Sequence, residues 1–192
     1  MKKICFATNN PNKLREIRQA LEGHFNVVGM QEIGCTEDIP EPYDTLEENS
    51  NAKAVHIWEK FQIDCFGDDT GLEVEALNNA PGVLSARYAG EQKDNNANIR
   101  LLLKNLAGKP HRKARFRTVI TLYLQGKSHQ FEGIVNGHIT EELRGEEGFG
   151  YDPVFVPEGH THTFAEMSLE EKNKISHRGK AVQQLISFLK NV

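Results

Sequence analysis

The amino-acid sequence predicts an α/β protein. Short apolar segments with the length of buried strands alternate with longer segments in which apolar residues recur at helical spacing. Residues 4–7 and 13–21 form the first such pair, and residues 63–67 and 95–106 supply a further strand and helix. Alternation of this kind is typical of a sheet covered by helices.

The first strand and helix are joined by a polar turn. Leu14, Ile17 and Leu21 share one face of the helix expected over residues 13–21. Asn10 suits the N-cap of this helix and Pro11 suits its first position. The unit is therefore strand, polar loop, helix.

Two capping-box patterns mark the starts of later helices. Residues 45–48 open a helix on which Asn49 and Lys53 lie four apart on one polar face. Residues 168–171 open a short helix. A last helix is expected over residues 176–189.

The longest strand pattern lies in the second half of the chain. Residues 114–124 alternate as a strand, and residues 125–128 turn the chain into a second strand near 130–135. Asn136-Gly137 favours another tight turn, and a glycine bulge in a continuing strand is the alternative.

Length and composition favour a single domain over residues 1–192. The 38% hydrophobic content can fill a core, and no apolar run approaches the ~20 residues that a membrane span needs. The three cysteines, Cys5, Cys35 and Cys65, are far apart in sequence and fit reduced, buried thiols. We therefore expect a cytoplasmic protein with no membrane contact.

The net charge of -4 argues against a nucleic-acid-coating protein, because such binding needs a broad excess of lysine and arginine. It does not exclude a small anionic ligand. A few local cations can hold a phosphate group in an acidic protein, and a bound metal ion adds charge.

Residues 8–13, Thr-Asn-Asn-Pro-Asn-Lys, form the first candidate site. A helix N-terminus attracts phosphate through its N–H groups and its partial positive charge. Lys13 in the first helical turn opposes the helix dipole, so a nearby anion would stabilise it. The alternative is a capped turn with Lys13 in solvent.

Asp68 and Asp69 follow an expected strand and form the second candidate site. Carboxylates at a strand end can hold Mg²⁺ or activate water. In extended chain their side chains diverge, so one would face the site and the other away. The alternative is a solvated turn or a helix cap.

The third and fourth candidates lie near the C-terminus. In the glycine-rich segment 145–152, Phe149 and Tyr151 could stack on a base, and the alternative places both aromatics in the core. Lys172 and residues 176–178 add basic groups at two helices, for which a solvated surface is the alternative.

Together these segments resemble the inosine triphosphate pyrophosphatase family. The resemblance is carried by residues 6–13 (FATNNPNK) with Glu16, 67–90, 148–153 (GFGYDP) and 176–179 (SHRG), in the family's order and spacing. It extends from residue 4 to residue 190. Departures such as Asn78-Asn79, Leu84 and Leu143 remove no charged group.

The resemblance implies an elongated two-lobed α/β fold around a mixed sheet flanked by helices, with the active site in the cleft between the lobes. It implies a homodimeric, Mg²⁺-dependent hydrolase acting on a small-molecule nucleoside triphosphate. The expected reaction converts ITP, dITP and XTP to the monophosphate and pyrophosphate, which cleanses the nucleotide pool.

By position, the resemblance also assigns roles to residues. Asp69 would be the catalytic base, and Glu41, Asp69 and Asp68 would hold the metal. The phosphates would contact Thr8, Asn9, Asn10, Pro11, Asn12, Lys13 and Lys53, with Thr70 also in contact with substrate. The base pocket would comprise Phe149, Gly150, Tyr151, Asp152, Lys172, His177 and Arg178.

Base choice follows from the 6-position of the purine. Hypoxanthine and xanthine carry an oxygen there, whereas adenine carries an amino group. Donors from Arg178 or from loop amides would lose their partner in ATP, and a buried unpaired donor costs ~1–3 kcal/mol.

Two alternative functions stay open. A related pyrophosphatase for modified pyrimidine nucleotides would share the phosphate half of the site. A non-catalytic nucleotide-binding protein would keep Lys13 and the aromatic loop, but it would not need Glu41 or the two aspartates.

Overall fold

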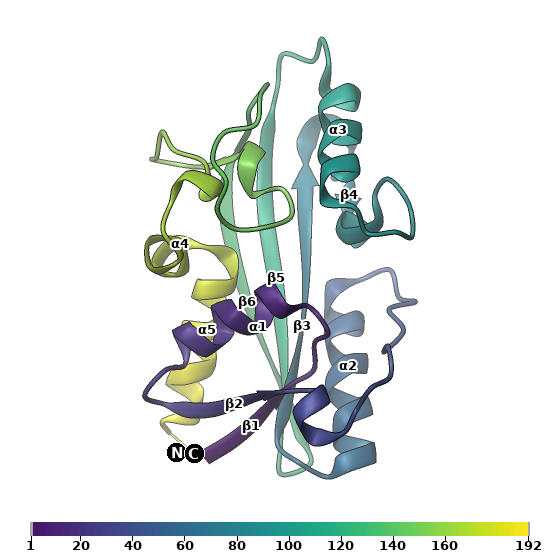
Figure 1. The fold of residues 1–192 in the computed structure, drawn as a ribbon, viewed down its shortest axis with the longest axis vertical. Coiled ribbons are helices and arrows are strands. Elements are labelled where there is room, and N and C mark those ends of the chain that lie inside the picture. The colour runs from purple at the N-terminus through teal and green to yellow at the C-terminus, as the bar shows by residue number, and fades with distance from the viewer. Residues whose placement is uncertain (1, 192) are drawn as a thin grey trace. The chain divides into compact units, whose positions relative to one another are not determined.

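The computed structural model describes residues 2–191 (Figure 1). Within them, seven strands form one sheet in the order β2-β1-β3-β5-β6-β7, with β4 paired to β3. β1 is parallel to β2 and β3, whereas β4 and β7 are antiparallel to β3 and β6. The strands are β1 (Lys2–Phe6), β2 (Phe25–Gly29), β3 (Cys65–Val74), β4 (Pro81–Gly82), β5 (Lys113–Leu124), β6 (Lys127–Ile139) and β7 (Phe155–Pro157).

Five α-helices accompany the sheet within residues 2–191, which confirms the α/β class. They are α1 (Pro11–Ala20), α2 (Leu46–Phe61), α3 (Asn95–Leu106), α4 (Leu169–Ile175) and α5 (His177–Leu189). Short 3-10 helices cover Gln31–Ile33, Glu75–Leu77, Ser85–Arg87, Asp152–Val154 and Phe164–Glu166. None of the helices in this part of the chain is long and apolar enough to cross a membrane.

The described chain divides into two compact units. Unit 1 holds the residues up to Asp69, Thr118–Gly133 and those from Arg178 onward, and unit 2 holds Thr70–Arg117 and Ile134–His177. The single domain expected over residues 1–192 and the cleft expected between two lobes stay predictions.

Helices cover both faces of the sheet in unit 1. Successive strand side chains point to opposite faces, so Ile4 and Phe6 of β1 pack with residues of α1 and α5, whereas Cys5 packs with residues of α2. Figure 1 shows α1 and α5 on one side of β1 and α2 on the other. Cys35 and Cys65 join the α2 side, and all three cysteines are buried free thiols, as expected.

The core of unit 2 is built around α3 and three phenylalanines. Leu102 of α3 packs in one cluster with Leu72 of β3 and Phe116 of β5. The Phe116 ring lies 4.7 Å from that of Phe155 and 6.2 Å from that of Phe164, between ring centres. Tyr151, from the loop that follows β6, belongs to the same hydrophobic core cluster.

Two strands run further than the sequence pattern predicts. β3 continues to Val74, so Asp68 and Asp69 lie within a strand and not after it. β6 continues through Gly137, so the favoured tight turn there is wrong and the continuing strand is right. A Cβ at position 137 would collide with the carbonyl oxygen of Val156 on β7, which explains the glycine.

Candidate active site

Asp68 and Asp69 are consecutive in β3, and their carboxylates diverge as expected. Asp68 accepts hydrogen bonds from Lys13 Nζ (2.9 Å) and Arg178 Nε (3.1 Å). Asp69 Oδ1 lies 3.6 Å from Lys53 Nζ. Both aspartates are buried, so neither is a solvated turn residue.

A chain of alternating charges runs along the Asp68 side of unit 1. Lys13 of α1 pairs with Asp68, Asp68 with Arg178 of α5, and Arg178 with Glu16 of α1. Arg178 and Glu16 are each 2% exposed, and such buried charges are tolerated only when paired. Burial raises the pKa of Asp68, but Lys13 and Arg178 outweigh it and hold that pKa well below its usual range.

Glu16 was part of the sequence motif without an assigned role. A signal for it existed, because Glu16 lies three residues after Lys13 and therefore shares its helix face. Lys13 itself is not in solvent, since its ammonium is on Asp68. Burial lowers the pKa of Lys13.

Lys53 of α2 contacts Asp69 on the face of β3 opposite to the Asp68 side chain. Its Nζ pairs with the Glu41 carboxylate and donates to the backbone oxygen of Asp68 at 2.8 Å. Burial alone would lower the pKa of Lys53, but Asp69 and Glu41 outweigh it, so this pKa is raised. Burial also raises the pKa of Asp69, despite the nearby Lys53.

The donor set fits a Mg²⁺ ion that shares its ligands with a substrate. Within residues 2–191, no three His, Cys, Asp or Glu side chains gather closely enough to hold a metal alone. Mg²⁺ is commonly held by one or two carboxylates together with substrate phosphates. Glu41 and Asp69 meet at the Lys53 ammonium, whereas both oxygens of Asp68 bond cations. Glu41 and Asp69 are thus carboxylates that could hold a Mg²⁺ ion, and the assignment of Glu41, Asp69 and Asp68 as metal ligands stays a prediction.

The turn before α1 is held by its own side chains. Asn10 caps the helix as predicted, and its Oδ1 accepts from the N–H groups of Asn12 (2.9 Å) and Lys13 (3.2 Å). Thr8 Oγ accepts from the Asn10 N–H, and Asn9 Nδ2 donates to Asp38 Oδ1. Two helix N–H groups are thus capped within the turn and the Lys13 ammonium is paired with Asp68, so the phosphate contacts expected of residues 8–13 stay a prediction.

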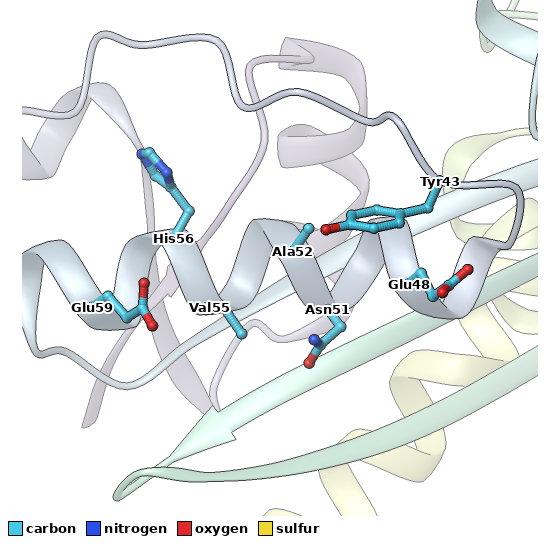
Figure 2. Close-up of a pocket in the computed structure, with 7 residues that line it drawn as sticks. All are labelled: Tyr43, Glu48, Asn51, Ala52, Val55, His56 and Glu59. Atoms are coloured by element: carbon cyan, nitrogen blue, oxygen red, sulfur yellow. The ribbon is translucent and has the colours of Figure 1, made fainter.

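An open pocket of about 480 Å³ lies on a different face of α2 (Figure 2). Figure 2 shows the ring of Tyr43 over Ala52. The lining residues are Tyr43, Glu48, Asn51, Ala52, Val55, His56 and Glu59. They include two carboxylates and no lysine or arginine, so this pocket does not suit a phosphate group.

In unit 2, Lys172, Asp152 and Phe149 form a compact cluster. Lys172 Nζ donates to Asp152 Oδ2 at 2.6 Å and lies 4.9 Å from the centre of the Phe149 ring. The same oxygen accepts from the Phe149 N–H at 3.0 Å. Gly148 has φ +74°, and a Cβ there would collide with the Asp152 carboxylate. The glycine thus allows the loop to fold around Asp152.

The other expected base-pocket residues lie deeper or in the loop backbone. Tyr151 is 5% exposed, and its hydroxyl donates to the Ser85 carbonyl oxygen at 2.7 Å. His177 is buried and stacks on Phe116, with ring centres 4.5 Å apart. Gly150 adopts φ +62° and Thr70 is partly buried in β3. The alternative that both loop aromatics lie in the core is therefore right for Tyr151 and wrong for Phe149, which is partly exposed.

The predicted residues thus fall into two clusters, each within one unit. Lys13, Lys53, Glu41, both aspartates and Arg178 gather in unit 1, and Phe149, Tyr151, Asp152, Lys172 and His177 belong to unit 2. Arg178 was grouped with the base pocket, but its guanidinium bonds two carboxylates of unit 1.

Buried lysines, an arginine and carboxylates thus lie together on the mixed sheet of an α/β protein. The particular family follows from sequence comparison: the chain belongs to the Ham1 family, which it matches over residues 4–188.

Relatives named dITP/XTP pyrophosphatase match over nearly the whole chain. A Porphyromonas gingivalis protein named dITP/XTP pyrophosphatase is 59% identical over 190 residues, covering 98% of each chain. A Bacillus subtilis protein of the same name is 45% identical over 193 residues, again covering 98% of each.

Solved structures confirm the fold. A HAM1 protein from Coxiella burnetii is 37% identical and superimposes with a TM-score of 0.90, covering 100% of each chain. The Staphylococcus aureus Ham1 protein is 38% identical, with a TM-score of 0.88 and 99% of each chain covered.

Proposed function

We propose that this chain is a nucleoside triphosphate pyrophosphatase that hydrolyses ITP, dITP and XTP to the monophosphate and pyrophosphate, with Mg²⁺. The observation that carries the proposal is the buried Asp69 carboxylate beside Lys53 and Glu41. Relatives named dITP/XTP pyrophosphatase support the substrate class.

The charge balance of the unit 1 cluster supports a metal ion as part of the proposal. Three cations face four carboxylates there, so the cluster alone carries a formal charge of about −1 and would repel a triphosphate. Mg²⁺ held by Glu41 and Asp69 would reverse that sign and neutralise phosphate charge. Lys13 and Lys53 then supply the remaining positive charge from fixed positions.

Asp69 is the group suited to activate water. Its carboxylate lies beside Lys53, which also pairs with Glu41, and a carboxylate next to the bound phosphate can act as a general base. It accepts a proton from a water molecule whose oxygen attacks the α-phosphorus, and the bond from that phosphorus to the pyrophosphate oxygen breaks. Hydrolysis in ¹⁸O-labelled water tests the position of attack, since the label is then expected in the monophosphate and not in pyrophosphate.

Lys172 and Phe149 are the groups suited to read the base. The partly exposed Phe149 ring offers a stacking surface, and the Lys172 ammonium beside it is a donor for an oxygen at the purine 6-position. Adenine presents an amino group at that position, so the donor loses its partner. Arg178 stays a proposed contributor, although its guanidinium is held by Glu16 and Asp68.

The deciding experiment measures pyrophosphate release from ITP, XTP, dITP, ATP and GTP, with Mg²⁺ and with EDTA. Metal-dependent release from the first three, well above ATP and GTP, is expected. Equal turnover of all five would contradict the base pocket. No turnover with ITP still bound would favour the non-catalytic nucleotide-binding protein, and preference for modified pyrimidine nucleotides in the same assay would favour the related pyrophosphatase.

A homodimer in the cytoplasm completes the proposal. Sedimentation equilibrium at micromolar concentration is expected to give twice the 21.7 kDa chain mass. A mass equal to one chain would contradict the dimer without affecting the proposed chemistry.

A further inference from the structure

Ser85 lies where three segments of unit 2 meet. Its hydroxyl accepts from the Leu72 N–H of β3 at 2.8 Å and donates to the Gly82 carbonyl oxygen at 2.5 Å. Its own carbonyl oxygen accepts from the Tyr151 hydroxyl at 2.7 Å. The hydroxyl and the carbonyl oxygen of this buried residue therefore connect β3, β4 and the loop that carries Phe149 and Asp152.

Asn98 of α3 binds the backbone of the segment that contains Ser85. Its Nδ2 donates to the carbonyl oxygens of Ala86 (2.9 Å) and Ser85 (3.4 Å), and its Oδ1 accepts from the Ala89 N–H at 2.7 Å. Asn98 is 2% exposed. A buried amide satisfied in this way fixes the backbone around it, because breaking any of these bonds leaves a buried polar group unpaired.

We propose that Tyr151 is a positioning residue: its hydroxyl, bound to the Ser85 carbonyl that Asn98 also contacts, fixes the loop that presents Phe149 and Asp152 to the base. The proposal rests on the proposed function for its consequence in catalysis. Resemblance placed Tyr151 among the groups that contact substrate, but its ring is buried in the hydrophobic core of unit 2 and its hydroxyl is bound within the protein.

The physical reason lies in the loop's own conformation. Gly148 and Gly150 both adopt positive φ. Because glycine lacks a Cβ and adopts positive and negative φ about equally well, these two residues give the loop little intrinsic preference for this structure. Asp152 binds the Phe149 N–H from inside the loop. The loop is also tied to unit 2 by the Lys172–Asp152 pair and by the bond from the Glu147 N–H to the Ala165 carbonyl oxygen. The Tyr151 hydroxyl adds a bond on the Ser85 side, toward β3 and α3.

The test compares Tyr151→Phe with Tyr88→Phe. Both changes remove one phenol hydroxyl from unit 2, but the Tyr88 hydroxyl only accepts from exposed Asn105. Hydrogen–deuterium exchange is measured by mass spectrometry on peptides covering 145–153. Tyr151→Phe is expected to speed exchange in these peptides about 3- to 10-fold, the change expected for one lost hydrogen bond, and Tyr88→Phe to leave it unchanged.

The kinetic readout separates positioning from general damage. Tyr151→Phe is expected to raise the KM for ITP about 3- to 10-fold with kcat within twofold. Inhibition by inorganic tripolyphosphate, which has no base, is expected to stay at the wild-type level. Unchanged exchange and unchanged KM would overturn the proposal, and so would an equal loss of tripolyphosphate binding.

Because hydrogen–deuterium exchange does not depend on catalysis, it tests the positioning role of Tyr151 separately from the proposed function. If wild-type protein fails to hydrolyse ITP, the proposed function fails, while faster exchange confined to Tyr151→Phe still supports the positioning role. If wild-type protein is active and Tyr151→Phe matches it in both readouts, only the positioning role fails.

Discussion

The residue clusters of unit 1 and unit 2 are held together by different kinds of interaction. In unit 1, Lys13, Asp68, Arg178 and Glu16 form a buried chain of alternating charges. In unit 2, outside the Lys172–Asp152 pair, neutral interactions dominate: the Tyr151 hydroxyl binds Ser85, Ser85 binds the Leu72 N–H, and His177 stacks on Phe116. A phosphate site needs buried cations, which are stable only with carboxylates beside them. A base site needs flat surfaces and directed donors, which neutral groups can fix.

The largest effect is expected for the Asp69→Asn variant. Removing the base is expected to lower kcat for ITP by roughly 10²- to 10⁴-fold, while ITP binding measured by calorimetry persists. Asparagine keeps the shape of the side chain beside Lys53, so the fold is retained. Full activity of this variant would show that Asp69 is not the catalytic base. The unit 1 cluster would then be left with a role in binding the substrate.

Asp68→Asn tests whether the charge chain is structural. It leaves the buried Lys13 and Arg178 without their shared carboxylate, and breaking a buried pair costs about 3–5 kcal/mol. Urea unfolding measures this loss. The matched control is Glu170→Gln, which breaks the exposed pair with Lys174 and is expected to cause no measurable change. Equal stability of both variants would contradict the difference between buried and exposed pairs.

Lys172→Met tests the base side alone. The change removes the donor over Phe149 and is expected to narrow the ratio of kcat/KM for ITP over ATP by about 10-fold. Lys174→Met, two residues further and exposed, is the control. Inhibition by tripolyphosphate is expected to be unaffected by either change. A ratio that stays at the wild-type value would show that unit 2 does not read the base through Lys172.

The smallest effect is expected for thiol labelling in unit 1. Burial raises the pKa of Cys5 and of Cys65 to about 12, and Cys35 is also buried. Native protein at pH 8 is therefore expected to take up no iodoacetamide within an hour, whereas unfolded protein is alkylated at all three sites. Mass spectrometry counts the adducts. Rapid labelling of native protein would show that the α2 side of the core opens readily.

Local rules account for the parts that the sequence predicted well. Asn10 caps α1, Ser168 forms the capping box of α4, and the consecutive aspartates point to opposite faces. Each depends on a few adjacent residues. The strands β2, β4 and β7 were not predicted, because each is short and is stabilised by its pairing partner more than by its own pattern.

The α/β class, the helix starts, the family resemblance and the residue types of the candidate site can all be read from the sequence. Those features follow from local spacing and from motifs read along the chain. The fold is needed to see that Arg178 binds Asp68, that Glu16 completes the charge chain, and that the Tyr151 hydroxyl binds the Ser85 carbonyl oxygen. These pairs are 66 to 162 residues apart, and burial, which forces each charge or polar group to find a partner, is settled by the packing of the folded chain.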